Sequence, residues 1–236
     1  MRVTLPVFND RGLAALQGPL EPYLRPEDTL MLVSGNVDKP LSLPWLEATL
    51  PALRALPPQR LLAATAGHAH LAALADAGLK VAGLVYIYEP GFANVPEFSW
   101  EAPRTLWALQ EARALAQGYP LVFKPTGRAL LQGYLRRYGW HYGRFAERCD
   151  ALFVQTQTYC RAGTFGAALE KLARECAAHL DRTYVQVTAD PAAPNGVPSA
   201  QALACLRAAH PFAGATLWWS PRAQDAVRAC LAALRP

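Results

Sequence analysis

The chain of 236 residues is 52% hydrophobic and 17% charged, with a formal net charge of +5. This composition excludes a disordered chain and is sufficient for one large hydrophobic core. The sequence has no apolar stretch of the ~18 residues that a membrane span needs, and its N-terminus lacks the apolar segment of a signal peptide. We therefore expect a cytoplasmic protein, unless a leader has already been removed.

A short apolar or aromatic run, a polar turn and a helix with apolar periodicity recur eight times along the chain. The runs are predicted at 3–8, 29–34, 61–65, 82–88, 121–124, 151–156, 183–188 and 215–219. Apolar strands that alternate with helices are typical of parallel sheets. Eight such units predict a single (β/α)8 TIM barrel of the α/β class, as one domain over residues 1–236. A doubly wound open sheet is the alternative, and the lack of a GxGxxG motif after the first run disfavours it.

The predicted helices follow these runs at a regular spacing. They are expected at 10–24, 43–56, 68–78, 100–117, 164–179 and 199–209, with a basic aromatic helix after Gly127 and a last helix from Pro221. Arginines cluster among aromatic residues in the segment 134–148, a pattern that also occurs in nucleic-acid-binding helices. Long arginine stems and rings commonly cover the sheet on an outer barrel helix, so we favour a small-molecule partner over nucleic acid.

Polar residues follow every predicted strand. Parallel barrel strands direct their C-terminal ends to one face, where barrel enzymes hold their active sites. The sequence therefore predicts a polar ring at this face, in which Asp10 and Asn36 are candidate ligand contacts. The ring consists of Asp10, Asn36, Asp38, His68, His70, Glu89, Lys124, Gln155, Gln157, Asp190 and Ser220.

Glu89 is the strongest candidate for catalysis. It ends the aromatic strand Tyr86-Ile87-Tyr88 and precedes the longest loop. Apolar surroundings raise the pKa of a carboxyl group, as a general acid requires near neutral pH. Asp190 is the second candidate catalytic carboxylate, although its position before Pro191 fits an ordinary turn equally well. Tyr88 is a candidate substrate contact, and the alternative for Glu89 is an ion pair with Lys124 or an arginine.

Amide, indole and amine groups complete the predicted site. Gln155 and Gln157 alternate on the sixth strand and share one face, so they either bind sugar hydroxyls or form a polar layer in the barrel. Trp218 and Trp219 point to opposite faces, and Trp219 is the candidate platform for a sugar ring. Lys124 ends the fifth strand and could form a Schiff base if it is desolvated. If a carboxylate holds Lys124, it stays charged and only contacts the substrate.

Several of these motifs resemble those of a known group of proteins. The order Tyr86-x-x-Glu89, Glu101-Ala102-Pro103, Lys124-Pro125-Thr126, the run 150–157 and Trp218-Trp219 resembles a family of uncharacterised bacterial barrels described as glycoside-hydrolase-like. Glu89 is also similar in position to the acid/base of the retaining glycoside-hydrolase barrel clan, whose nucleophile ends strand seven, as Asp190 does here. The chain departs from that clan at Tyr88, where asparagine is usual, and at Asp190, where glutamate is usual. The resemblance to this clan implies a carbohydrate substrate and general acid/base catalysis, whereas the resemblance to the uncharacterised family implies no particular activity.

Three functions remain open from the sequence. The first is a glycosidase-like hydrolase that uses Glu89 and Asp190. The second is a non-catalytic barrel that binds a carbohydrate or another small ligand, and the third is a Schiff-base lyase that uses Lys124. Each acts at the C-terminal ends of the strands, and the sequence indicates neither the substrate nor the oligomeric state.

Cofactor and metal motifs are weak. His68-Ala69-His70 offers two imidazoles, but no other predicted strand end offers a third, so we expect no metal site and no cofactor. The five cysteines form no CxxC pair, and we expect them to be buried free thiols.

Overall fold

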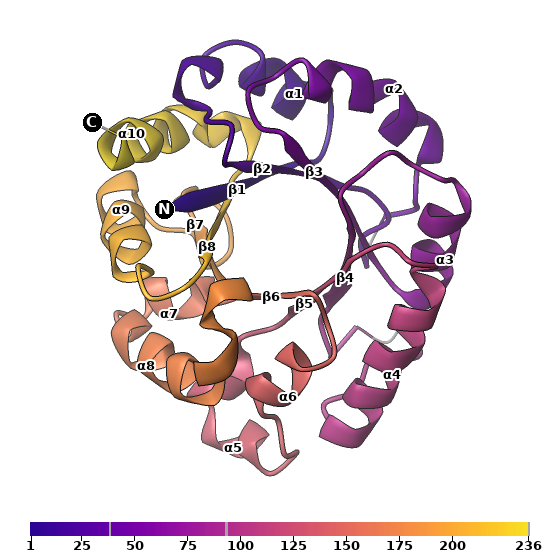
Figure 1. The fold of residues 1–236 in the computed structure, drawn as a ribbon. Coiled ribbons are helices and arrows are strands. Elements are labelled where there is room, and N and C mark those ends of the chain that lie inside the picture. The colour runs from indigo at the N-terminus through magenta and orange to yellow at the C-terminus, as the bar shows by residue number, and fades with distance from the viewer. Residues whose placement is uncertain (38, 93, 236) are drawn as a thin grey trace.

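Eight parallel strands close into a barrel in the computed structural model of the protein (Figure 1). Each strand pairs with the next one in the chain, and β8 pairs with β1. This confirms the predicted (β/α)8 architecture. The strands are β1 (Arg2–Val7), β2 (Thr29–Val33), β3 (Arg60–Ala66), β4 (Leu84–Tyr88), β5 (Leu121–Pro125), β6 (Ala151–Val154), β7 (Thr183–Thr188) and β8 (Gly214–Trp218).

The structure describes residues 1–37, 39–92 and 94–235, so Asp38 of the predicted polar ring lies outside the described residues. The α-helices are α1 (Asp10–Leu16), α2 (Leu43–Arg54), α3 (His68–Asp76), α4 (Ala102–Leu115), α5 (Gly133–Arg136), α6 (Tyr142–Ala146), α7 (Gln157–Arg161), α8 (Phe165–Glu175), α9 (Ser199–Ala208) and α10 (Gln224–Leu234). Short 3-10 turns are η1 (Glu21–Tyr23), η2 (Arg128–Leu130), η3 (Ala177–Arg182) and η4 (Pro221–Ala223). None of these described helices combines the length and hydropathy needed to cross a membrane.

The helix predicted after β5 is interrupted in the structure, and an additional helix precedes the one predicted after β6. The segment after β5 forms α5 and α6 instead of one aromatic helix, and the segment after β6 forms α7 and α8. Gly139 and Gly163 lie at the two breaks with φ of 75° and 70°, in the left-handed region that ends helices. The glycines therefore stop the first helix of each pair and turn the chain into the second.

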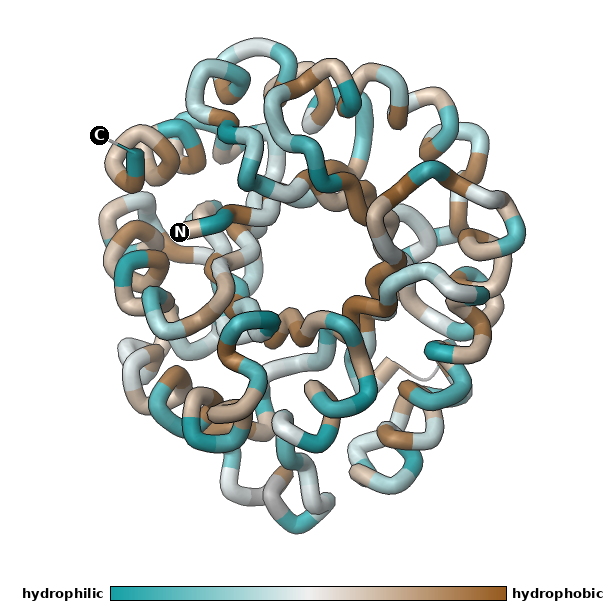
Figure 2. The backbone as a smooth tube through the Cα atoms, in the orientation of Figure 1, coloured by the Kyte–Doolittle hydropathy of each residue, from teal (hydrophilic) through white to brown (hydrophobic). Residues whose placement is uncertain are grey.

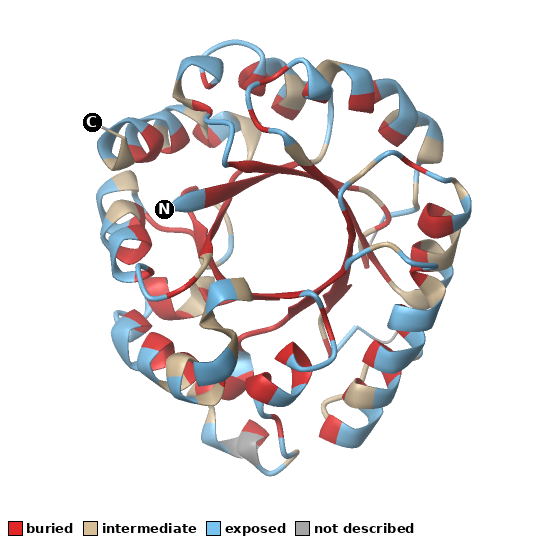
Figure 3. Ribbon diagram, viewed as in Figure 1, coloured by how far each residue is buried: buried red, intermediate tan, exposed pale blue. Residues whose placement is uncertain are grey.

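The helices surround the barrel and bury one side against it. Figure 3 shows buried strands and helices that alternate between buried and exposed residues. Figure 2 shows hydrophobic residues concentrated along the strands, whereas the loops around them are more hydrophilic. Because side chains alternate along a strand, half of each strand packs under the helices and half fills the barrel.

The barrel interior changes from apolar to polar around its circumference. Met31, Leu62, Val85 and Val122 belong to one buried cluster that lies inside the strands. Lys124 is in register with the interior residue Ile87, and both face the same side of the sheet. The other polar interior residues form a row in which Gln186 is in register with Thr216, and Thr216 with Thr4. Lys124 and this polar row are therefore the polar residues available for a site inside the barrel.

A buried carboxylate lies at the opposite, N-terminal end of the barrel. Asp28 precedes β2 and is fully buried. Its Oδ1 accepts hydrogen bonds from the Val3 N–H at 3.1 Å and from Arg235 at 2.6 Å, and its Oδ2 accepts from the Arg25 N–H at 2.9 Å. Asp28 therefore joins the start of β1 to the end of α10.

Candidate functional site

A hollow of about 180 Å³ lies at the C-terminal mouth of the barrel, on the side of β4 to β7. Its floor includes the interior-facing residues Glu89, Thr126 and Gln155, which follow β4, β5 and β6. Glu89 comes two residues after Ile87, so it continues the interior face of β4. Thr126 and Gln155 are joined by an isolated parallel bridge. The structure thus brings Glu89 and Gln155 together, as the sequence predicts.

Gln157 lines the same hollow, although it does not extend the strand. The last residue of β6 is Val154, and Gln157 begins α7, which corrects the predicted alternation with Gln155 on one strand. The amide oxygen of Gln157 is buried and has no hydrogen-bond partner among the described residues. It is therefore an acceptor available to a ligand that carries a hydroxyl or N–H group.

Lys124 lies inside the barrel below this hollow and is 1% exposed. Its Nζ donates a hydrogen bond to Oε1 of Gln186 at 2.5 Å and lies 4.5 Å from the ring centre of Trp218. Among the described residues, no carboxylate is within ion-pair distance of the amine. Burial lowers the pKa of Lys124 from its ordinary 10.5 to about 7, although the charge of Glu89 acts to raise it. A large fraction of this amine is therefore neutral at physiological pH.

The tryptophan pair at the end of β8 is divided between the two sides of the sheet. Trp218 packs in the barrel interior, over Lys124 and edge-on to Phe8 at 4.7 Å. Trp219 is 3% exposed in the outer core, and its indole N–H has no partner among the described residues. The prediction of Trp219 as the ligand platform is therefore wrong, because Trp218 is the ring that faces the barrel.

Tyr88 lies between the barrel and α4, away from the mouth. Its hydroxyl accepts a hydrogen bond from the Ser99 N–H at 2.7 Å and donates to main-chain oxygens of the same loop. Its ring is fully buried against Phe98 and Phe123. Burial raises the pKa of Tyr88, so the hydroxyl keeps its proton. Tyr88 supports the loop after β4, and the prediction that it contacts substrate is corrected.

Both carboxylate oxygens of Asp190 accept hydrogen bonds from neighbouring residues. Its carboxylate accepts hydrogen bonds from the Ala192 N–H at 3.1 Å, the Ser220 hydroxyl at 2.6 Å and Arg222 Nε at 3.2 Å. Burial raises the pKa of Asp190, but these three hydrogen bonds and the Arg222 charge more than offset it, so that the pKa lies below its ordinary value. Asp190 joins the loops after β7 and β8 and does not line the hollow of Glu89.

Asp10 and Asn36 line a different hollow of about 460 Å³, near the ends of β1 and β2. Oδ1 of Asp10 accepts a hydrogen bond from Trp45 Nε1 at 2.9 Å, and Oδ1 of Asn36 accepts from the Val37 N–H at 2.8 Å. This hollow shares no lining residue with that of Glu89. The predicted polar ring is therefore split into at least two sites.

The two histidines of His68-Ala69-His70 bind main-chain oxygens. Nε2 of His68 lies 2.8 Å from the Ala108 oxygen, and Nδ1 of His70 lies 3.2 Å and 3.1 Å from the oxygens of Gly35 and Ala66. Since carbonyl oxygens only accept, each of these nitrogens carries a proton. In the part of the chain that the structure describes, no three histidine, cysteine or acidic side chains are grouped so as to hold a metal ion.

Gln186 is the site residue that the sequence analysis missed, and Trp218 is the residue that it considered but set behind Trp219. Gln186 shares the face of Tyr184 and Thr188 in β7, so the alternation of polar residues with Val185 and Val187 was the available signal. Comparison with known proteins adds no assignment, since no family model matches the chain and no curated protein matches it.

Proposed function

We propose that the protein is a lyase that forms a Schiff base between Nζ of Lys124 and a small hydroxylated aldehyde or ketone. The observation that carries this proposal is the placement of Lys124 inside the catalytic end of the barrel, with an amide and a ring as its partners. A lysine that serves only structure is expected to pair with a carboxylate when it is buried. A desolvated, neutral amine is instead the nucleophile that carbonyl chemistry requires.

Glu89 is the group placed to move protons in this reaction. Its carboxylate lines the hollow above the lysine and has no hydrogen bond or ion pair with the described residues. Nζ attacks the carbonyl carbon, and the carbinolamine loses its hydroxyl as water with a proton from Glu89. The resulting iminium ion accepts the electron pair of the bond between the α and β carbons, while the Glu89 carboxylate takes the proton of the β-hydroxyl.

The hollow favours a small substrate with several hydroxyl groups. Its volume of about 180 Å³ is below the range of drug-sized pockets, so it suits a compound of a few carbon atoms. The carboxylate of Glu89 and the unpaired amide oxygen of Gln157 are acceptors for substrate hydroxyls. Trp218 covers Nζ, and its ring has to turn aside before a carbonyl carbon reaches the amine.

A glycosidase with two carboxylates has less support. Such enzymes place two carboxyl groups on either side of the scissile bond, about 5–9.5 Å apart. Asp190 has both oxygens occupied by Ser220, Arg222 and Ala192, and it lies outside the hollow of Glu89. Our proposal therefore includes carbohydrates only as small open-chain compounds with a free carbonyl group.

Reductive trapping tests the proposal. The protein is incubated with glyceraldehyde, dihydroxyacetone or pyruvate, reduced with borohydride and analysed by peptide mass spectrometry. We expect a covalent adduct on Lys124 that is absent from the Lys124→Met variant and present in Lys80→Met, which removes an exposed lysine. Absence of any adduct on Lys124 with all three compounds would argue against the lyase.

The role of Glu89 is separable from that of the lysine. In Glu89→Gln we expect the adduct on Lys124 to form more slowly but to be detected after long incubation, while carbon–carbon cleavage of a compound that forms this adduct slows about 10²–10⁴-fold. Glu97→Gln is a matched control, because that glutamate follows the same strand but lies outside this hollow. Cleavage at an unchanged rate in Glu89→Gln contradicts the assignment.

A non-catalytic binding barrel is the second candidate function. It is favoured by the cover of Trp218 over a lysine that is 1% exposed, since the hollow could hold a polyol without access to the amine. This function predicts saturable binding of glycerol or dihydroxyacetone in calorimetry, with no adduct after borohydride. An adduct on Lys124 excludes a purely binding role.

We also propose that the protein works in a reducing compartment, the cytoplasm. All five cysteines are buried free thiols, as expected from the sequence, and disulfides are rare in reducing compartments. Alkylation of thiols before lysis should find all five cysteines reduced in cells. A disulfide found in that experiment would contradict this location.

A further inference from the structure

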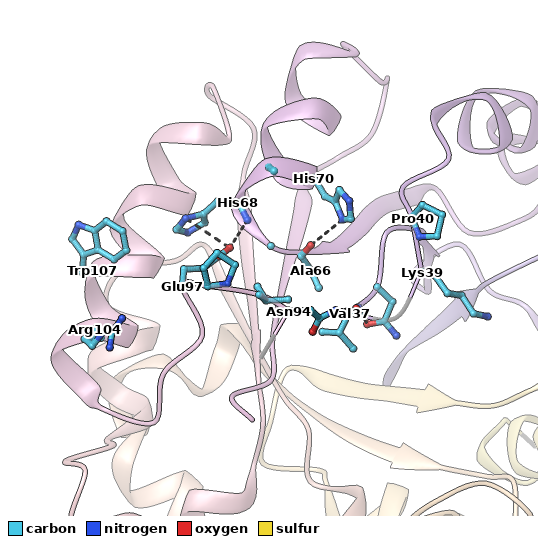
Figure 4. Close-up of a pocket in the computed structure, with 15 residues that line it drawn as sticks. Val37, Lys39, Pro40, Ala66, His68, His70, Asn94, Glu97, Arg104 and Trp107 are labelled. Carbon is cyan, nitrogen blue, oxygen red and sulfur yellow. Dashed lines mark hydrogen bonds and ion pairs between the residues drawn. The ribbon is translucent and has the colours of Figure 1, made fainter. Parts of the chain in front are cut away.

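Another cavity at this end of the molecule, of about 830 Å³, lies beside the end of β3 (Figure 4). The loops after β2, β3 and β4 form it together with α3 and α4. It shares no lining residue with the hollow of Glu89, so the function proposed above leaves it unexplained. Its size is within the range of pockets that bind small organic ligands.

One acidic side chain lines the described part of this cavity, and its charge is already engaged. Oε1 of Glu97 accepts hydrogen bonds from the His68 N–H at 2.5 Å and from the Tyr86 hydroxyl at 3.4 Å. The His68 ring lies beside it, with Nδ1 at 3.8 Å from the same oxygen. The Glu97 side chain is only 8% exposed. Glu97 therefore caps the start of α3 and presents little negative charge to a ligand.

Two cationic side chains line opposite sides of the cavity. Figure 4 shows Arg104 on α4 at one side and Lys39, in the loop after β2, at the other. Both are exposed, and neither side chain forms a hydrogen bond or ion pair with the described residues. The positive charge of this cavity is therefore available to an anion.

An exposed aromatic ring stands next to one of these cations. Trp107 is 54% exposed and lies one helical turn after Arg104, so both side chains are on one face of α4. Its ring lies edge-on to that of His68, with ring centroids 6.1 Å apart and an interplanar angle of 68°. Val37, Val95 and the proline Pro96 make much of the remaining lining apolar. An exposed tryptophan beside a cavity is a typical platform for a flat ligand.

We propose that this cavity binds an organic anion that carries a flat aromatic ring. The ring stacks on Trp107, and the anionic group pairs with Arg104, one helical turn away on the same face of α4, while Lys39 adds positive potential from the opposite side. The proposal is independent of the lyase activity, because it uses none of the residues around Lys124. A mononucleotide and an aromatic carboxylate share this chemistry, and the test distinguishes them.

Calorimetry on the full chain tests binding with four probes. AMP and 4-hydroxybenzoate carry both the ring and the anionic group, whereas adenosine lacks the anion and inorganic phosphate lacks the ring. We expect AMP or 4-hydroxybenzoate to bind at least tenfold more tightly than both partial probes. If neither complete probe binds more tightly than adenosine and phosphate, the proposal is overturned.

Variants then locate the bound anion. We expect Arg104→Ala to weaken binding about tenfold and Trp107→Ala by a similar factor while circular dichroism shows the fold intact, whereas Lys39→Ala, on the opposite side, has a smaller effect. Arg161→Ala is the matched control, since it removes an exposed arginine on α7 and should leave the affinity unchanged. Tight binding that none of the three cavity variants weakens would place the anion elsewhere and overturn the proposal.

Discussion

The two ends of the barrel treat buried charge in opposite ways. At the N-terminal end, the Asp28 carboxylate is fully buried and is matched by Arg235 and two main-chain N–H groups. Asp150, which is exposed at the same end, is also paired and accepts hydrogen bonds from the Leu121 N–H and from Arg113. At the C-terminal end, Lys124 is equally buried but has no ion-pair partner among the described residues.

We interpret this difference as a contrast between an end built for stability and the end that carries the proposed chemistry. A buried charge that is paired and hydrogen-bonded is tolerated by the fold, whereas an unpaired one destabilises it. An unpaired buried lysine persists at one end, and unpaired titratable groups of this kind concentrate at functional sites. The barrel end with the unmatched lysine is therefore the end at which we place the reaction.

Removal of the unmatched amine is expected to have the largest effect on stability. Burial lowers the pKa of Lys124 from its ordinary 10.5 to about 7. Between pH 7 and 10.5 the unfolded chain therefore binds more protons than the folded chain. The contribution of Lys124 to the free energy of unfolding, measured as the difference between the natural protein and Lys124→Met, should therefore rise across this range by on the order of 4 kcal/mol. Lys124→Met should be the more stable protein at pH 6, as measured by urea unfolding at pH 6, 8 and 10. Parallel pH profiles for the two proteins would contradict the unmatched burial.

Removal of the Asp28 carboxylate, which is paired with Arg235, should instead destabilise the protein. Asp28→Asn leaves Arg235 buried without its counter-charge, and we expect it to lower the free energy of unfolding by about 3 kcal/mol. Asp225→Asn removes an exposed ion pair with Arg228 and should change stability by less than about 0.5 kcal/mol. Equal effects of the two substitutions in urea unfolding would show that the N-terminal end gains nothing from burial of its pair.

The smallest effect is expected at Asp190. This carboxylate lies at the C-terminal end of the barrel, but it is paired, as Asp28 is at the N-terminal end. Asp190→Asn weakens the bonds to Ser220 and Arg222, and we expect a loss of about 1 kcal/mol near pH 7. Because its pKa lies below the ordinary value, this contribution is present above about pH 4 and disappears as the pH falls further. Formation of the borohydride adduct should be unchanged, and a loss of turnover above tenfold would return Asp190 to the catalytic residues.

The sequence predicts the fold well because eight apolar runs at a regular spacing leave few architectures. It fails where one residue decides the outcome. Gly139 divides the helix predicted after β5 through a left-handed backbone conformation that residue periodicity does not reveal. Adjacent residues of a strand point to opposite sides of the sheet. Whether Trp218 or Trp219 faces the barrel therefore depends on the exact register of β8, which the sequence pattern does not give.

The candidate site is predicted only in part for a similar reason. Strand ends identify Glu89, Lys124 and Gln155, since their position follows from the topology alone. The partners of a side chain do not follow from topology. Asp190 is bound by Ser220 from another loop, and Lys124 is bound by Gln186 rather than by a carboxylate. These contacts depend on the packing of loops and side chains that lie far apart in the sequence.

The most direct test of the account is the titration of Lys124 itself. The chain has only four lysines, at 39, 80, 124 and 171, so NMR of protein labelled with ¹³C at the lysine ε-carbon yields four resolvable signals. The signal that is missing in Lys124→Met should titrate near pH 7, because burial lowers the pKa of this amine. If that signal instead titrates above pH 10, Lys124 is an ordinary charged lysine and the proposed Schiff-base chemistry is contradicted.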